Sequence, residues 1–179
     1  VELREDLLGD LAELRWRAER FAAALSACRG ACGPGLARWR SASARAPVGP
    51  PDAKEVAWSV CAAAALFNAE LFFEVHELLE PPWGRAEGPL RSFLQGLIQI
   101  AVGLHHRSTG NHRGALSLLA DGNAKLRPFV PEAWRVELGS LCSAVDAIVA
   151  RLREASSGAA SDLSSLEIVL PRLTLRSSA

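Results

Sequence analysis

The sequence lacks both net charge and a membrane-length apolar run. Its 179 residues include 20 lysines and arginines against 20 aspartates and glutamates, so the formal net charge is zero at pH 7. Proteins that bind nucleic acid or a membrane surface through bulk charge need a charge excess. The uncharged run 56–69 is shorter than the roughly 20 residues of a membrane-spanning helix. We therefore expect no nucleic-acid partner and no membrane.

Cysteines are few, and their spacing lacks a metal-binding signature. The four are Cys28, Cys32, Cys61 and Cys142. Cys28 and Cys32 leave a redox or metal role open, but no second Cys/His pair has matching spacing. Cys61 and Cys142 lie in apolar helical runs and are expected to act as small hydrophobes. Since the chain also begins with an acidic amphipathic stretch instead of a basic and then apolar leader, we expect a cytoplasmic location.

Alternating strand patterns and tandem repeats are missing, and helical periodicity dominates. Hydrophobic residues make up 49% and charged residues 22%, as in a globular chain. Two segments carry apolar residues at alternating spacings of four and three, which predicts heptad helices. The first seam comprises Leu7, Leu11, Leu14, Ala18, Phe21, Leu25 and Cys28. The second comprises Trp134, Leu138, Leu141, Val145, Ile148 and Leu152. The two seams could pair antiparallel or recruit a helical partner.

Three further helices are expected between these seams. The second helix begins at an Asp52 cap and runs to about Glu80, where Pro81-Pro82 end it. The third, from Leu90 to His106, has apolar residues around most of its surface and should be central. The fourth runs from His112 to about Leu126 and is capped by Asn111. Glycines inside helices (Gly96, Gly103 and Gly114) are expected where another helix approaches closely.

These elements predict an all-α fold. We expect a single-domain bundle of about five helices, with a long connector after the first helix and an extended C-terminal tail. The expected divisions are an N-terminal heptad helix (1–30), a connector (31–54), a helical core domain (55–155) and the tail (156–179).

Candidate chemistry concentrates in 66–83, at the end of the second helix. At 100° per residue, His76, Glu77 and Glu80 fall on one arc of that helix. The spacing of His76 and Glu80, i and i+4, allows both to reach one cation, and Glu77 beside them could act as a base. The third helix offers a complementary stripe of Gln95, Gln99, Val102 and His106 at spacings of four, three and four. A semi-buried His/Glu/Gln site between the two helices follows.

The same residues allow three interpretations. They could bind a divalent metal, although His-Glu-x-x-Glu lacks the second histidine of the zincin motif. They could form a buried hydrogen-bonded network that fixes helix packing, with His76 bridging Glu80 and Gln99. They could also form an acid–base pair for catalysis.

Two motifs resemble a known family. The first contains Phe72-Phe73-Glu74, His76-Glu77, Leu79-Glu80 and Trp83, and the second contains Gln95–Gln99, His106 and Gly110-Asn111. From about Phe67 to Leu126 the chain resembles the family known as domain of unknown function 309. The resemblance implies a small all-helical bundle but brings no established activity. It also implies that the family's signature positions are His76, Glu77, Glu80, Gln99, His106 and Asn111.

The chain departs from the family pattern at two places. Ala69-Glu70-Leu71 precede the Phe-Phe pair, where the family usually has a small residue and then an acidic or polar one. Pro81-Pro82 replace helical residues before Trp83, which could shift this tryptophan relative to the carboxylates.

The leading hypothesis is a protein that binds a small ligand or a divalent metal. Expected metal ligands are His76, Glu80 and His106, and expected ligand-binding residues are Trp83, Gln95, Gln99 and Asn111. One alternative is a metal-assisted hydrolase with Glu77 as general base and His76 as a catalytic partner. Another is a helical interaction module, or a homo-oligomer, that associates through its heptad seams while the polar cluster is structural. The sequence does not decide whether the protein is an enzyme.

Overall fold

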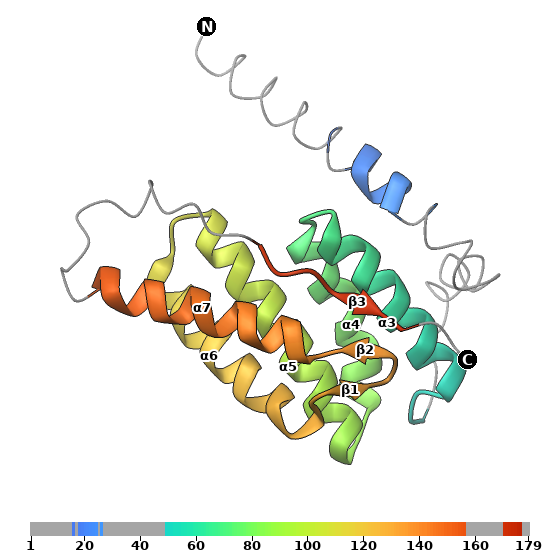
Figure 1. The fold of residues 1–179 in the computed structure, drawn as a ribbon. Coiled ribbons are helices and arrows are strands. Elements are labelled where there is room, and N and C mark those ends of the chain that lie inside the picture. Colours follow the sequence, from blue (N-terminus) through green and yellow to red (C-terminus); the bar gives the residue numbers. More distant parts are fainter. Residues whose placement is uncertain (1–15, 17, 25, 27–48, 157–169, 177–179) are drawn as a thin grey trace, which may run out of the picture.

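The structure is a computed structural model that describes residues 16, 18–24, 26, 49–156 and 170–176. Within 49–156 it contains five α-helices, which are α3 (Ala53–Asn68), α4 (Phe72–Arg85), α5 (Gly88–Ser108), α6 (His112–Leu126) and α7 (Gly139–Ser156). Helix α5 packs between α4 and α6, while α3 covers α4 and α7 lies along α6 (Figure 1). The predicted all-α bundle is confirmed. Residues 31–48 of the predicted connector lie outside the described ranges.

The predicted N-terminal heptad helix is described only in part. Residues 16, 18–24 and 26 are helical, and the rest of the seam lies outside the described ranges. Arg20 donates a hydrogen bond to the carbonyl of Ala69, just beyond α3, and Ala24 is buried. The Arg20 hydrogen bond is made at the end of α3, whereas pairing with the last helix, or with a helix of a partner, was what the seams left open.

The predicted second helix is in fact two helices, so the expectation of one continuous helix from Asp52 to Glu80 is wrong. Asp52 does cap α3, since its side chain accepts a hydrogen bond of 2.7 Å from the amide of Glu55. The helix ends because Glu70 adopts a left-handed conformation with φ of 62°. The amides of Glu70 and Leu71 then bond to the carbonyls of Phe67 and Leu66. This pattern is a Schellman motif, which usually has glycine at the left-handed position.

Replacing Glu70 with glycine is therefore expected to raise the free energy of unfolding by about 1 kcal/mol, because a residue with a Cβ atom pays roughly that cost in the left-handed region. Urea denaturation would measure the change. Glu70→Ala is the matched control, since it removes the carboxylate but keeps the Cβ atom. Equal stability of the two variants would show that the backbone conformation of Glu70 carries no cost.

Pro81 and Pro82 lie inside α4, so the prediction that they end the helix is wrong. Proline removes one intrahelical hydrogen bond and usually breaks a helix. Here the helix continues through both prolines because one face of α4 is anchored in the core, and that face includes Leu78, Leu79 and Pro82 itself. At the end of α4, the Arg91 guanidinium donates hydrogen bonds of 3.0 and 3.3 Å to the backbone carbonyls of Trp83 and Ala86.

The predicted fifth helix begins later than its heptad pattern suggested. After η1 (Arg127–Phe129), β1 (Glu132–Ala133) and β2 (Val136–Glu137) form an antiparallel hairpin. Its turn residues, Trp134 and Arg135, both have positive φ, as a two-residue hairpin turn of type I′ requires. Trp134 is held there by Phe93, with the ring centroids 4.5 Å apart. Packing of this indole therefore overrides the helical pattern.

Helix α7 then starts at Gly139 with an unusual cap. The Glu137 carboxylate accepts hydrogen bonds from the amides of Gly139 and Ser140, at 2.7 and 3.2 Å, and from the Ser140 hydroxyl. The Ser140 hydroxyl bond is the main reason that the pKa of Glu137 lies below its ordinary value. The side chain preceding the helix thus satisfies amides that the helix itself leaves unpaired.

The C-terminal tail is extended where it is described, at 170–176. Strand β3 (Thr174–Leu175) pairs antiparallel with β2 and completes a small three-stranded sheet. The Asn68 side chain at the end of α3 brackets the backbone of Leu173 with two hydrogen bonds of 2.9 and 3.0 Å. Leu173 is buried, so the tail closes one side of the core.

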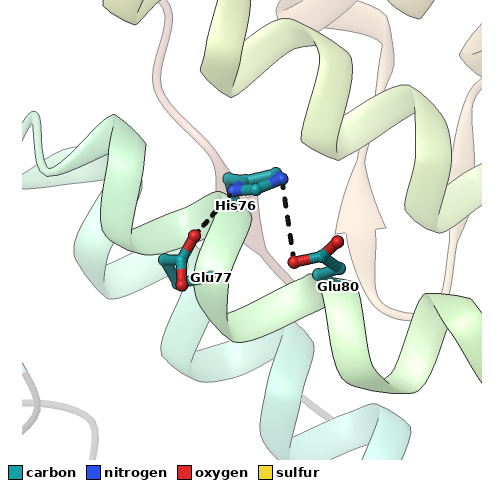
Figure 2. Close-up of side chains that lie close together, drawn as sticks. All are labelled: His76, Glu77 and Glu80. Carbon is teal, nitrogen blue, oxygen red and sulfur yellow. Dashed lines mark hydrogen bonds and ion pairs between the residues drawn. The ribbon is translucent and has the colours of Figure 1, made fainter.

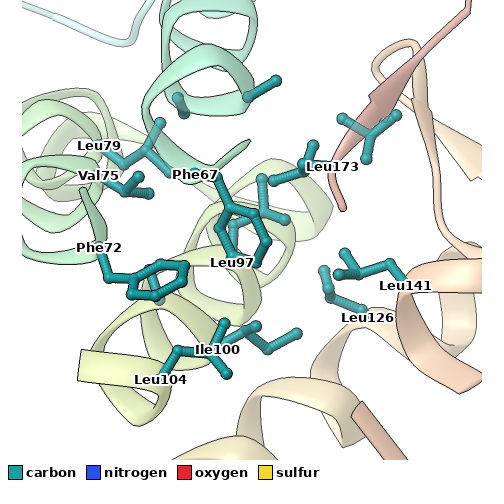
Figure 3. Packing of buried hydrophobic residues seen from close by; sticks show 14 of the residues in the cluster. Phe67, Phe72, Val75, Leu79, Leu97, Ile100, Leu104, Leu126, Leu141 and Leu173 are labelled. Carbon is teal, nitrogen blue, oxygen red and sulfur yellow. The ribbon is translucent and has the colours of Figure 1, made fainter. Parts of the chain in front are cut away.

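The core joins all five helices. One buried cluster contains Phe67 of α3, Leu79 of α4, Leu97 of α5, Leu126 of α6 and Leu141 of α7 (Figure 3).

Helices α5 and α6 approach each other closely, as the glycines inside α5 predicted. A Cβ atom on Gly122 would lie 2.9 Å from the backbone carbonyl oxygen of Gly96, and one on Gly103 would lie 2.8 Å from Leu119. Gly114 is not explained by a neighbouring helix. A Cβ atom added there would meet the capping side chain of Asn111.

Two cysteines can be assessed. Cys142 is a buried free thiol whose pKa is raised by burial. Cys61 takes part in a disulfide bond, so the prediction that it acts only as a small hydrophobe is wrong.

No helix in the described part of the chain is both long and apolar enough to cross a membrane.

Candidate functional site

The strongest candidate site lies on α4, where His76 is flanked by two carboxylates (Figure 2). Nδ1 of His76 lies 3.1 Å from Oε1 of Glu77, and Nε2 lies 4.0 Å from Oε2 of Glu80. One ligand atom from each of the three residues can be chosen so that all lie within 4.8 Å of one another. Helical periodicity produces this grouping, because a residue and its i+4 neighbour share a face.

The site is more exposed than the sequence predicted. The exposed fractions of the side chains are 29% for His76, 56% for Glu77 and 54% for Glu80. Solvent therefore reaches both carboxylates, which need no buried counter-charge. The predicted buried network is not formed, since among the described residues no hydrogen bond joins His76 to Gln99.

The two carboxylates face opposite nitrogens of the imidazole. If Nδ1 carries the proton, it donates to Glu77, and the lone pair of Nε2 then faces Glu80. A carboxylate that holds one ring nitrogen in this way orients many metal-binding histidines. In that tautomer the two carboxylates have different roles: Glu77 orients the ring, and Glu80 lies beside the free nitrogen.

His105, not His106, is the histidine of α5 that faces α4. Its ring centroid lies 5.9 Å from that of Phe73, which in turn lies 6.1 Å from His76. His106, a predicted metal ligand, falls outside the His76 group and pairs its Nδ1 with Nδ2 of Asn111 at 3.2 Å. The spacing of residues along α5 did not single out His105, because its contact with Phe73 depends on how α5 is rotated against α4.

Asn111 acts first as a helix cap. Its Oδ1 accepts a hydrogen bond of 3.0 Å from the amide of Gly114, which confirms the predicted cap of α6. Together with the contact to His106, this occupies both ends of the side-chain amide.

The structure does not bring the other predicted ligand-binding residues to His76 by hydrogen bonds within the described ranges. The Cβ atom of Gln99 lies next to Gly122 on α6, and its buried Oε1 has no donor among the described residues. Gln95 is half-buried on α5. The Trp83 ring lies under the Arg91 guanidinium, 4.5 Å from the ring centroid. Its buried indole nitrogen likewise has no acceptor in the described part.

The α4 cluster groups donor atoms of the kinds that can hold a metal ion. Zinc is bound by imidazole nitrogen and carboxylate oxygen at about 2.0–2.2 Å, so two ligands of a tetrahedral ion lie about 3.3 Å apart. The 4.0 Å between Nε2 of His76 and Oε2 of Glu80 exceeds this by an amount that side-chain rotation can close.

Fold and site together define a class: a small all-α bundle with a His/Glu cluster on the exposed face of one helix. Residues 60–118 match the family model described as domain of unknown function (DUF309), which confirms the resemblance. The match extends from α3 into α6 and includes every candidate site residue. No curated protein matches the chain.

Proposed function

We propose that this protein binds a divalent metal ion, with zinc as the best fit, through Nε2 of His76 and the carboxylate of Glu80. The observation that carries the proposal is the flanking of one imidazole by Glu77 and Glu80, at 3.1 and 4.0 Å. Glu77 acts as the residue that orients His76. Mixed imidazole and carboxylate ligands suit zinc, copper, iron and nickel better than magnesium or calcium.

The same geometry favours binding over hydrolysis. A general base must be free to accept a proton from a metal-bound water. Oε1 of Glu77 instead lies 3.1 Å from Nδ1 of His76, where it accepts a hydrogen bond whenever that nitrogen carries the proton. The hydrolase alternative would require this bond to break, and the binding function needs it to remain.

Isothermal titration with Zn²⁺ tests the proposal. We expect His76→Ala and Glu80→Gln each to weaken zinc binding by about 10-fold or more, because each removes a direct ligand. Glu77→Gln should also weaken it, within the roughly 10–100-fold range for residues that orient a ligand. Glu87→Gln is the matched control, since Glu87 is an exposed carboxylate at the start of α5, outside the cluster.

Stability measurements give an independent readout. Zinc that binds only the folded state raises the melting temperature, and a chelator should reverse that rise. The wild type should show the shift and His76→Ala should not. Equal zinc affinity of the wild type and His76→Ala would overturn the proposal.

A further inference from the structure

We propose that the bound metal ion is shared by two copies of this chain, each supplying His76 and Glu80. The inference rests on the proposed metal-binding function and names the partner that completes the site. It places the contact on the exposed face of α4, whereas the sequence suggested the heptad seams.

A single chain leaves the coordination incomplete. Zinc in proteins takes about four ligands in a tetrahedron. The described residues offer only Glu77 in addition to His76 and Glu80 in this group. Glu77 is paired with Nδ1 of His76, so the direct ligands from one chain are two. A second copy related by a two-fold axis supplies the same pair again, and an isologous contact of this kind is the commonest in homo-oligomers.

An apolar side chain stands beside the ligands on the same face. Phe73 precedes His76 by one helical turn, its ring centroid lies 6.1 Å from that of His76, and 46% of the residue is exposed. A two-fold contact centred on His76 would cover Phe73 from both copies. Burial of this apolar surface would favour the dimer.

The charges make the association dependent on metal. Each copy brings the carboxylates of Glu77 and Glu80 to the contact. From α5, His105 faces this surface of α4 through its ring contact with Phe73. Four carboxylates brought together without a cation repel one another. A divalent ion offsets that repulsion, so the metal-free protein is expected to be monomeric.

Sedimentation equilibrium with increasing Zn²⁺, combined with metal analysis of each species, tests the proposal. We expect the mass to double as zinc is added, with one zinc ion per two chains, and EDTA to restore the monomer. His76→Ala should remain monomeric. Phe73→Ser should weaken the zinc-dependent dimer by about tenfold or more, the effect expected for losing roughly 1.4 kcal/mol of apolar burial. Val130→Ser is the control, because Val130 is also 41% exposed but precedes β1.

Four results would count against the inference. A monomer with one zinc ion per chain would overturn the shared site while leaving the proposed metal binding intact. Absence of zinc binding would overturn both. A dimer that persists in EDTA, or one that forms equally in His76→Ala, would show that the contact does not depend on the metal.

Discussion

Replacing Phe67 with alanine is expected to lower the free energy of unfolding by about 3–5 kcal/mol, the range for removing a buried aromatic side chain. Phe67 is 2% exposed, in the last turn of α3, and its ring meets Phe72 edge-on at a centroid distance of 5.3 Å. It therefore joins α3 to α4 across the Schellman turn at Glu70. The cavity would open inside the buried cluster that Phe67 shares with Phe72 and Leu97, so collapse could fill it only in part (Figure 3).

Chemical denaturation of the purified variant measures this loss. Phe73→Ala is the matched control, since Phe73 follows Phe72 directly but is 46% exposed, and we expect its removal to cost less than about 0.5 kcal/mol. A similar loss in both variants would contradict the assignment of Phe67 to the core and Phe73 to the surface. Phe73 lies on the proposed dimer contact. Phe73→Ala should therefore weaken association without much loss of stability, whereas Phe67→Ala should mainly lower stability.

The second large effect is expected at the crossing of α5 and α6. Gly122→Ala should lower the free energy of unfolding by about 1–3 kcal/mol, as overpacking does. The added Cβ atom would lie 2.9 Å from the Gly96 carbonyl oxygen and 3.0 Å from the side chains of Gln99 and Ile100. Because the first of these contacts is with backbone, the helices themselves must move apart.

Gly84→Ala, the same chemical change, is expected to raise the free energy of unfolding instead of lowering it. Gly84 lies in α4, and a Cβ atom added to it would have no neighbour within 4 Å, so alanine meets no obstacle there. Alanine is the better helix former by about 0.8–1.0 kcal/mol, and this variant should be more stable than the wild type. Thermal melts of the two variants should therefore move in opposite directions. Destabilisation by both would contradict a packing origin for the Gly122 effect.

The candidate site was predictable where it depends on a single helix. His76, Glu77 and Glu80 lie within little more than one helical turn, so their grouping follows from about 3.6 residues per turn alone. Their partners on α5 depend on how that helix is rotated against α4. A stripe at helical spacing predicted His106, whereas packing places His105 against Phe73. Which face of a helix meets its neighbour is decided by the whole core.

The sequence by itself determined the all-α class, the extents of α5 and α6, the caps at Asp52 and Asn111, and the close crossing marked by glycines. These features arise from local periodicity, capping and backbone sterics, which residues within one or two turns specify. Only the tertiary structure decided the break at Glu70, the passage of α4 through Pro81-Pro82 and the hairpin at Trp134. At each of these positions the burial of neighbouring apolar side chains outweighs a local preference, because its free energy comes from residues distant in the chain.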